Sequence, residues 1–335
     1  MRFFDTPFFA VMFASVLPAT PRRVVGRGWI VAALAIAVTG GVPARAAAQT
    51  ADSELDHWMA FVDDAARLGD LTIPGTHDSG ALFESFPGTA ICQDMSIANQ
   101  LDIGVRYLDI RLRQIGNALV VHHGAVYQHE NFDDVLIQVT GFLRANPSET
   151  VIMEVSSEHT PADNTESYEQ TFMRYVNHPS YRDAWWRERR ISRLGEVRGK
   201  IVLLRRFSGS ASVAGGIDVT GWRDNTQFTL TDAAGVRITV QDSYVVSSNG
   251  TKWSAITGLL GQAAGDTGGA WYVNFTSGYW SILGIPNILG VSGDINRRLL
   301  DYATTSTLHH AHHGTVVSDF VARPIVQQLL RLYFE

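Results

Sequence analysis

The stretch "LTIPGTHDSGAL", from Leu71 to Leu82, places two titratable side chains where an apolar run ends. The residues up to Thr76 are typical of a buried strand, and the Gly- and Ser-containing segment after them indicates a turn. His77 and Asp78 are therefore expected at the carboxyl end of a strand. In barrels of parallel strands, chemistry takes place at that end.

Seven further runs have the length and composition of strands. They are rich in β-branched and aromatic residues and nearly continuous in hydrophobicity, which suits strands buried on both faces of a parallel sheet. The eight predicted strands cover residues 70–76, 105–112, 118–123, 150–156, 200–207, 236–243, 270–277 and 314–320.

Helical patterns separate most of these strands. Residues 131–147 carry Phe132, Val135, Val139 and Leu143 on one face and end at Pro147. Similar patterns occupy residues 165–179, 251–264, 293–306 and 323–334. The alternation predicts an α/β fold consisting of a single, irregular (β/α)8 barrel of the TIM type.

Composition bounds the function. The chain has 335 residues, of which 45% are hydrophobic and 18% charged, as in ordinary globular proteins. Its net charge of −6 argues against a nucleic-acid partner. A single cysteine, Cys92, excludes an intrachain disulfide, and no protein partner is indicated.

The first 48 residues read as a targeting segment. Arg22, Arg23 and Arg27 precede an apolar run from Trp29 to Val42, and small residues up to residue 48 suit cleavage. The alternative is an uncleaved anchor helix, but the run is shorter than the ~20 residues that span a bilayer. We expect cleavage and a secreted or periplasmic product, which leaves residues 49–335 as one folded domain.

Polar side chains recur at the predicted strand ends. One such group alone is usually structural, but burying ionised groups singly is costly, so several strand ends of this kind favour a shared polar pocket. The residues concerned are His77, Asp78, Asp109, Arg111, His122, His123, Arg205, Arg206, Asp242, Tyr244 and Asp319.

Together these segments resemble a known family. "IPGTHDSG", "YLDIRLR", "VVHHG", "NPSETVIMEV", "GKIVLLRRFSG", "TVQDSY", "NFTS" and "VSDF" are similar, in order and spacing, to the bacterial phosphatidylinositol-specific phospholipases C. The resemblance runs from Leu71 to Phe320 and implies a catalytic barrel at residues 49–335. It implies attack of the inositol 2-hydroxyl on the adjacent phosphorus, giving diacylglycerol and inositol 1,2-cyclic phosphate. An internal nucleophile of this kind has a large proximity advantage.

The resemblance also implies catalytic roles. His77 is expected to be the general base and His123 the general acid, since an imidazole with a pKa of ~6.5 suits both tasks. Asp319 would hydrogen-bond His77 and hold its tautomer, as in a Ser-His-Asp triad. Asp78 would assist His123 or contact the 2-hydroxyl.

Arg111 would clamp the phosphate, and Asp109 would orient Arg111 or complete the polar network. A guanidinium at this position supplies the positive charge that a calcium ion brings in metal-dependent relatives, so we expect no metal and no cofactor. The opposing feature is "HHAHH", from His309 to His313, because closely spaced histidines can bind zinc or copper. This run precedes the last strand, where a solvated loop is the favoured interpretation.

For the headgroup, the resemblance implies that Arg206 and Asp242 grip inositol hydroxyls and that Tyr244 stacks on the ring. One position departs from the family: Ser156 stands where the bacterial enzymes have a lysine, with Glu158 nearby. A hydroxyl does not replace an ammonium, although it can hydrogen-bond. The preferred inositol lipid, with or without attached sugars, is therefore left open.

Tyr279, Trp280 and Leu283 lie in an apolar loop after a predicted strand. They either dip into a membrane surface or pack on the barrel. Two other functions remain open. One is a metal-dependent phosphodiesterase of glycerophosphodiesters or sphingolipids, which would need clustered carboxylates. The other is a non-catalytic lipid-headgroup or lectin-like binding protein.

Overall fold

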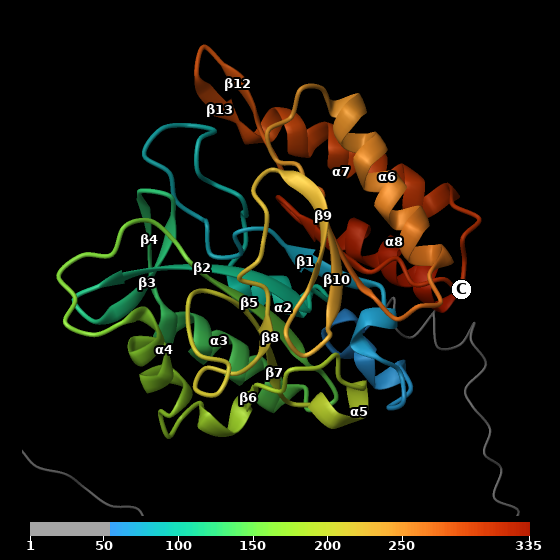
Figure 1. Cartoon of the computed structure of the whole chain (residues 1–335). Helices are drawn as coiled ribbons and strands as arrows, with labels where there is room; N and C mark the ends of the chain where they lie inside the picture. Colours follow the sequence, from blue (N-terminus) through green and yellow to red (C-terminus); the bar gives the residue numbers. More distant parts are fainter. Residues whose placement is uncertain (1–53) are drawn as a thin grey trace, which may run out of the picture. The chain divides into compact units, whose positions relative to one another are not determined.

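The computed structural model describes residues 54–335, and the targeting segment predicted at residues 1–48 lies outside them (Figure 1). The strands are β1 (Ile73–Thr76), β2 (Tyr107–Ile115), β3 (Ala118–His123), β4 (Val126–Asn131), β5 (Val151–Ser157), β6 (Trp185–Trp186), β7 (Ile201–Arg206), β8 (Ile217–Asp218), β9 (Thr226–Thr231), β10 (Arg237–Asp242), β11 (Trp271–Phe275), β12 (Trp280–Ile282), β13 (Ile285–Asn287) and β14 (Thr315–Ser318).

The helices lie between and after these strands. They are α2 (Ile97–Asp102), α3 (Phe132–Ala145), α4 (Tyr168–Val176), α5 (Leu194–Val197), α6 (Asn249–Gly265), α7 (Ile288–Thr305) and α8 (Arg323–Phe334), with 3-10 turns η1 (Leu55–Phe61), η2 (Leu68–Asp70) and η3 (Arg182–Ala184). The N-terminus of α3 shows why a helix starts there: the side chains of Asn131 and Asp134 form a capping box.

The main sheet runs in the order β6-β7-β5-β2-β1-β14-β11-β10-β9. All neighbours in this order are parallel except β9, which pairs antiparallel with β10. Seven of the eight predicted strands belong to this parallel sheet, and the predicted α/β class is confirmed. Within residues 54–335 no ladder joins the β9 edge to the β6 edge, so a closed eight-stranded barrel is not what these ladders form.

The eighth predicted strand, residues 118–123, was wrongly assigned to the barrel. It forms β3, which pairs antiparallel with the end of β2 and with β4. The reason is the short connection between β2 and β3, which contains Gly116 and Asn117 at positive φ. A tight turn of this kind joins antiparallel strands, whereas a parallel neighbour needs a crossover of a dozen or more residues.

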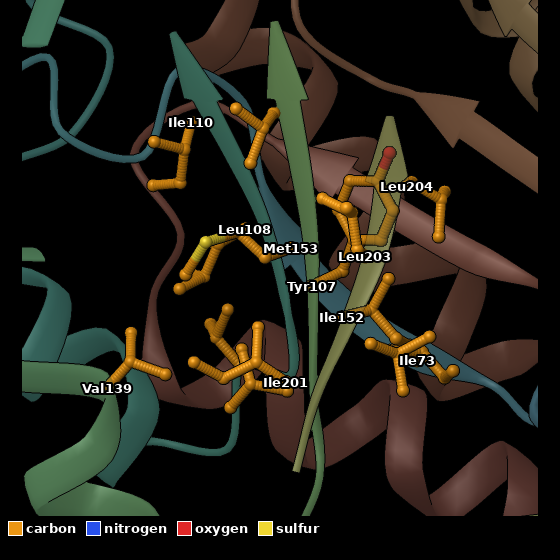
Figure 2. Packing of buried hydrophobic residues seen from close by; sticks show 14 of the residues in the cluster. Ile73, Tyr107, Leu108, Ile110, Val139, Ile152, Met153, Ile201, Leu203 and Leu204 are labelled. Carbon is orange, nitrogen blue, oxygen red and sulfur yellow. The ribbon is translucent and has the colours of Figure 1, made fainter. Parts of the chain in front are cut away.

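The core fills both faces of the sheet. Figure 2 shows Leu108 of β2 and Met153 of β5 on the side of α3, which contributes Val139, and Tyr107 on the opposite side. These residues are fully buried. Because neighbouring residues of a strand point to opposite faces, both faces of each central strand must be apolar. Truncating one such residue to alanine costs about 2–5 kcal/mol.

A second apolar cluster joins the helices at the C-terminal end of the chain. Ile256 of α6, Ile295 of α7 and Leu329 of α8 pack with Val316 of β14, and Figure 1 shows these three helices side by side. This packing holds β14 in place, and the carboxyl end of β14 leads to Asp319.

In the part of the chain from residue 54 onward, none of the helices combines the length and hydropathy needed to cross a bilayer.

Candidate active site

Strand register brings polar residues together on one face of the sheet. Asp109 of β2 aligns with Glu154 of β5, and Arg111 aligns with Ser156, which in turn aligns with Arg206 of β7. Residues two apart point to the same face, so this polar row continues the face that carries Tyr107 and Ile152. The same face is therefore apolar at the amino ends of the strands and polar at their carboxyl ends.

A cavity of about 410 Å³ opens at these carboxyl ends. Side chains of both signs and two aromatic rings surround it. Those that matter here are His77, Arg111, His123, Glu158, Arg206, Asp224, Asp242, Tyr244, Tyr279 and Asp319. Seven of these ten were singled out for catalysis or headgroup binding from the sequence, and Tyr279 was assigned to the membrane loop.

His77 follows β1 and pairs with Asp319, which follows the neighbouring strand β14. The His77 Nδ1 atom lies 2.7 Å from Asp319 Oδ1, and the second carboxylate oxygen accepts from Gly278 N at 3.3 Å. Gln93 ties the two strand ends together by donating to the carbonyls of His77 and Ser318. Burial lowers the pKa of His77, but the Asp319 carboxylate outweighs it, so the net pKa is raised from 6.5.

Asp78 is buried in a left-handed turn, with φ of 39°. Its Oδ2 atom lies 3.8 Å from Arg111 Nε and 3.9 Å from His123 Nδ1, and neither carboxylate oxygen has a hydrogen-bond partner. Burial raises the pKa of Asp78 to about 6, although His123 and Arg111 oppose the rise. The buried Asp78 carboxyl group therefore lies within electrostatic range of both Arg111 and His123.

Asp109 and Arg111 form an ion pair behind the cavity. Arg111 donates to Asp109 Oδ2 from its NH2 group at 2.9 Å and from Nε at 3.1 Å. Burial alone would raise the pKa of Asp109, but the charges of Arg111 and His77 lower it to about 2. The Arg111 side chain remains 18% exposed and reaches the cavity as a fixed cation. Asp109 is fully buried and orients it.

His123 comes from the end of the β3 hairpin, not from a parallel strand. Its ring lies 6.5 Å from the His77 ring, centroid to centroid, at an interplanar angle of 86°. The His123 Nδ1 atom is 2.7 Å from the Ala90 carbonyl oxygen, which fixes the ring orientation. The adjacent His122 contacts the Gly124 carbonyl and is not among the cavity residues.

The opposite half of the cavity is polar and aromatic. Arg206 donates to Glu154 Oε1 at 3.0 Å, and its guanidinium lies 4.4 Å from the Trp222 ring centroid. Trp222 Nε1 donates to Asp242 at 2.9 Å. Tyr244 donates to Asp224 at 2.7 Å. Arg206, Asp242 and Tyr244, which were singled out from the sequence, thus line the same cavity.

Ser156 and Glu158 occupy different positions. Ser156 is buried, its hydroxyl has no hydrogen-bond partner, and it is not among the cavity residues. Glu158 lines the cavity and accepts from Gly124 N at 2.8 Å. A carboxylate therefore faces the cavity close to the place where the family resemblance leads one to expect an ammonium.

The three residues predicted to contact a membrane lie in different environments. Tyr279 lines the cavity, whereas Trp280 is partly buried against the α7 cluster. Leu283 lies at the β12–β13 turn and is 99% exposed. Phe86, in the loop between β1 and α2, is 57% exposed and was not predicted.

Trp222 and Asp224 were also missed. Both lie between strands, in "GWRDN". Only the fold brings the Trp222 ring against the Arg206 guanidinium and the Asp224 carboxylate to the Tyr244 hydroxyl. A tryptophan next to a turn aspartate was the one available signal, because aromatic rings in polar loops are unusual without a contact to make.

Within residues 54–335, two groups of three potential metal donors converge, one of His77, Cys92 and Asp319 and the other of Asp78, Cys92 and His123. Both lie in or beside the cavity, where the Arg111 guanidinium repels a cation. The donors of the "HHAHH" run do not converge in this way within the same residues. Its last member, His313, is buried and contacts the Leu308 carbonyl.

The arrangement can move protons at a bound anion. His77 is oriented by a carboxylate, and His123 borders the same cavity, so one ring can accept a proton while the other donates one. Arg111 supplies a permanent positive charge for an oxyanion. Acid, base and cation together suit transfer at a phosphate ester.

Comparison with known proteins identifies the family. The sequence-family model of the phosphatidylinositol-specific phospholipase C X domain matches residues 77–207. A 1-phosphatidylinositol phosphodiesterase of Staphylococcus aureus (strain Newman) is 33% identical over 234 residues, which cover 66% of this chain and 75% of the relative. One of Listeria monocytogenes is 34% identical over 158 residues, covering 44% and 47%.

Solved structures agree with the sequence matches. A crystal structure of a pentafluoro-Phe variant of the S. aureus phosphatidylinositol-specific phospholipase C has a TM-score of 0.76 and 28% identity, and it covers 84% of this chain and 98% of that one. The chain therefore belongs to the bacterial phosphatidylinositol-specific phospholipase C family.

Proposed function

We propose that this protein cleaves the glycerol–phosphate bond of phosphatidylinositol, releasing diacylglycerol and inositol 1,2-cyclic phosphate. The observation that carries the proposal is the pair of imidazoles, His77 and His123, whose ring centroids are 6.5 Å apart at one cavity that Arg111 also lines. Rings this close can contact two oxygens of one phosphate.

The reaction divides between the two rings. His77, held by Asp319, takes the proton of the 2-hydroxyl as that oxygen attacks phosphorus. His123 gives a proton to the glycerol oxygen as the phosphorus–oxygen bond breaks. Arg111 stabilises the charge on the non-bridging oxygens, and proton transfer by each ring contributes on the order of 10²–10⁴ in rate.

The headgroup would occupy the other half of the cavity. Arg206 and Asp242 offer a donor and an acceptor to inositol hydroxyls, and the Tyr244 ring offers a stacking surface. Glu158 adds an acceptor from the side of His123, whereas Ser156 is buried and is not among the cavity residues. A carboxylate here disfavours inositols that carry extra phosphates, because like charges repel.

The lipid is proposed to lie at a membrane surface. Leu283 and Phe86 are exposed apolar side chains on two loops at the carboxyl end of the sheet, where the cavity opens. Tyr279 lies at the cavity itself. Contact through a few side chains of this kind gives transient binding rather than anchoring.

We further propose that the reaction needs no metal, because the Arg111 guanidinium already supplies the positive charge next to Asp78. The proposal also includes export after removal of residues 1–48, and residues 49–335 as the catalytic domain. The curled sheet would act as an irregular (β/α)8 barrel that remains open beside β9.

Phosphorus NMR tests the proposal. The mature protein, with phosphatidylinositol micelles and a chelator, is expected to give the signal of a five-membered cyclic phosphodiester. His77→Ala and His123→Ala should each lose nearly all activity while staying folded by circular dichroism. Near-wild-type turnover in either variant would show that the assigned roles are wrong, and activity that required added calcium would favour a metal-dependent phosphodiesterase.

A further inference from the structure

The loop of residues 82–91, between β1 and α2, is organised around one carboxylate. Glu84 Oε1 accepts from Gly88 N at 2.7 Å, and Oε2 accepts from the backbone nitrogens of Thr89, Ala90 and Ile91 at 2.9, 3.1 and 3.2 Å. Burial alone would raise the pKa of Glu84, but these four donors together outweigh it and lower the pKa overall. Hydrogen bonds to an ionised acceptor are stronger than neutral ones, so this side chain fixes the path of the loop.

The loop in turn holds a ring of the active site. The Ala90 carbonyl is 2.7 Å from His123 Nδ1, whereas Asp78 Oδ2 and Cys92 Sγ are each 3.9 Å from the same atom. Ala90 is therefore the partner within normal hydrogen-bond distance. With Nδ1–H donated to a carbonyl, Nε2 is the nitrogen left to serve the substrate.

We propose that Glu84 is a positioning residue for the general acid, acting through the Ala90 carbonyl that orients His123. The inference rests on the proposed function, in which His123 Nε2 gives its proton to the departing glycerol oxygen. Loss of the carboxylate frees the backbone of residues 88–91, and the Ala90 oxygen then no longer fixes the ring. Proton donation suffers, while Arg111 and the His77–Asp319 pair stay in place.

The test compares two substrates that differ in whether their leaving group needs a proton. Glu84→Ala and Glu84→Gln are assayed with a short-chain phosphatidylinositol kept below its micelle concentration, and with a p-nitrophenyl inositol phosphate. The first substrate loses an alkoxide, which needs a proton, whereas nitrophenolate leaves without one. Both substrates are monomeric in water, so contact of the loop with a membrane does not enter.

Asp232→Ala is the matched control. Asp232 accepts from Ala234 N at 2.8 Å and Val236 N at 2.9 Å in the turn joining β9 and β10, at the opposite end of the sheet. Asp232→Ala therefore removes the same kind of contact, from a carboxylate to backbone N–H groups of its own loop, at a place away from His123.

We expect Glu84→Ala to lower kcat on the short-chain lipid by about 10- to 100-fold, as misplacement of a catalytic group does, and on the nitrophenyl substrate by less than about 3-fold. Glu84→Gln should fall between Glu84→Ala and the wild type, and Asp232→Ala should match the wild type on both. Equal losses on both substrates, or none, would overturn the inference. A wild-type protein inactive on both would instead overturn the proposed function.

A second measurement applies if Glu84→Ala does not fold. Nitrogen-15 NMR of the wild type should find the proton of neutral His123 on Nδ1, and Glu84→Gln should weaken that preference. A wild-type His123 with its proton on Nε2 would refute the inference.

Discussion

Replacing Asp319 by asparagine should disable the base while leaving the cavity intact. The carboxylate accepts from His77 Nδ1 at 2.7 Å and from Gly278 N at 3.3 Å. An asparagine has one acceptor oxygen, and the Gly278 N–H favours pointing that oxygen away from His77. The amide NH2 group then faces Nδ1 and forces the proton of the neutral ring onto Nε2, where it blocks base catalysis. In a Ser-His-Asp triad the same exchange costs about 10⁴-fold in kcat.

The pH profile should move as well. His77 must be neutral to act, and its pKa is raised above 6.5, so kcat/KM of the wild type rises as pH increases through that raised value. Without the carboxylate the lowering effect of burial remains. A hydrogen bond to a charged group is worth about 1.5–3 kcal/mol and one pKa unit is about 1.4 kcal/mol, so the acidic limb should shift down by about 1–2 units.

The assay is kcat/KM on monomeric short-chain phosphatidylinositol between pH 4.5 and 9, with Asp266→Asn as a control. Asp266 accepts from Gly268 N and Ala270 N, at the other end of the sheet. Asp319→Asn activity within about 3-fold of the wild type, or an acidic limb that stays in place, would refute the assignment of His77 and Asp319.

Three further predictions each concern a single residue. Arg111→Lys keeps the charge but loses the paired contact to Asp109, so kcat should fall by about 10²–10³-fold at similar KM; a change in KM alone would contradict a transition-state role. Ser156→Lys, between Arg111 and Arg206 in the strand register, should change KM for phosphatidylinositol more than kcat. Equal effects across phospholipid headgroups would count against this. Leu283→Asp should reduce vesicle binding in a sedimentation assay and spare monomeric substrate; unchanged vesicle binding would remove this residue from the membrane surface.

The sequence was informative wherever local pattern reflects burial. All eight predicted strands exist, and α8 has the predicted bounds, because a strand or helix that faces a core must be apolar at a regular spacing. Polar residues that interrupted this pattern at strand ends, such as His77, Arg111 and Asp242, are cavity residues for the same reason.

Contacts between distant parts of the chain could not be predicted from the sequence pattern. Residues 118–123 have the composition of a barrel strand, and only the tight turn at Asn117 sends them back along β2 as a hairpin. Ser156 has the register of a site residue, yet Glu158 is the one at the cavity. Apolar periodicity says that a segment is buried but not which neighbour buries it.

The sequence by itself determined the strands, the helices between them and most of the polar groups that end those strands, since these depend on side chains a few residues apart. The tertiary structure alone decided that Asp319 contacts His77 and that His123 lies at the end of a hairpin. It also decided that Glu84 binds the loop whose Ala90 carbonyl contacts His123. Such pairings depend on strand register and loop path, which are set by packing across the whole fold rather than by any local pattern.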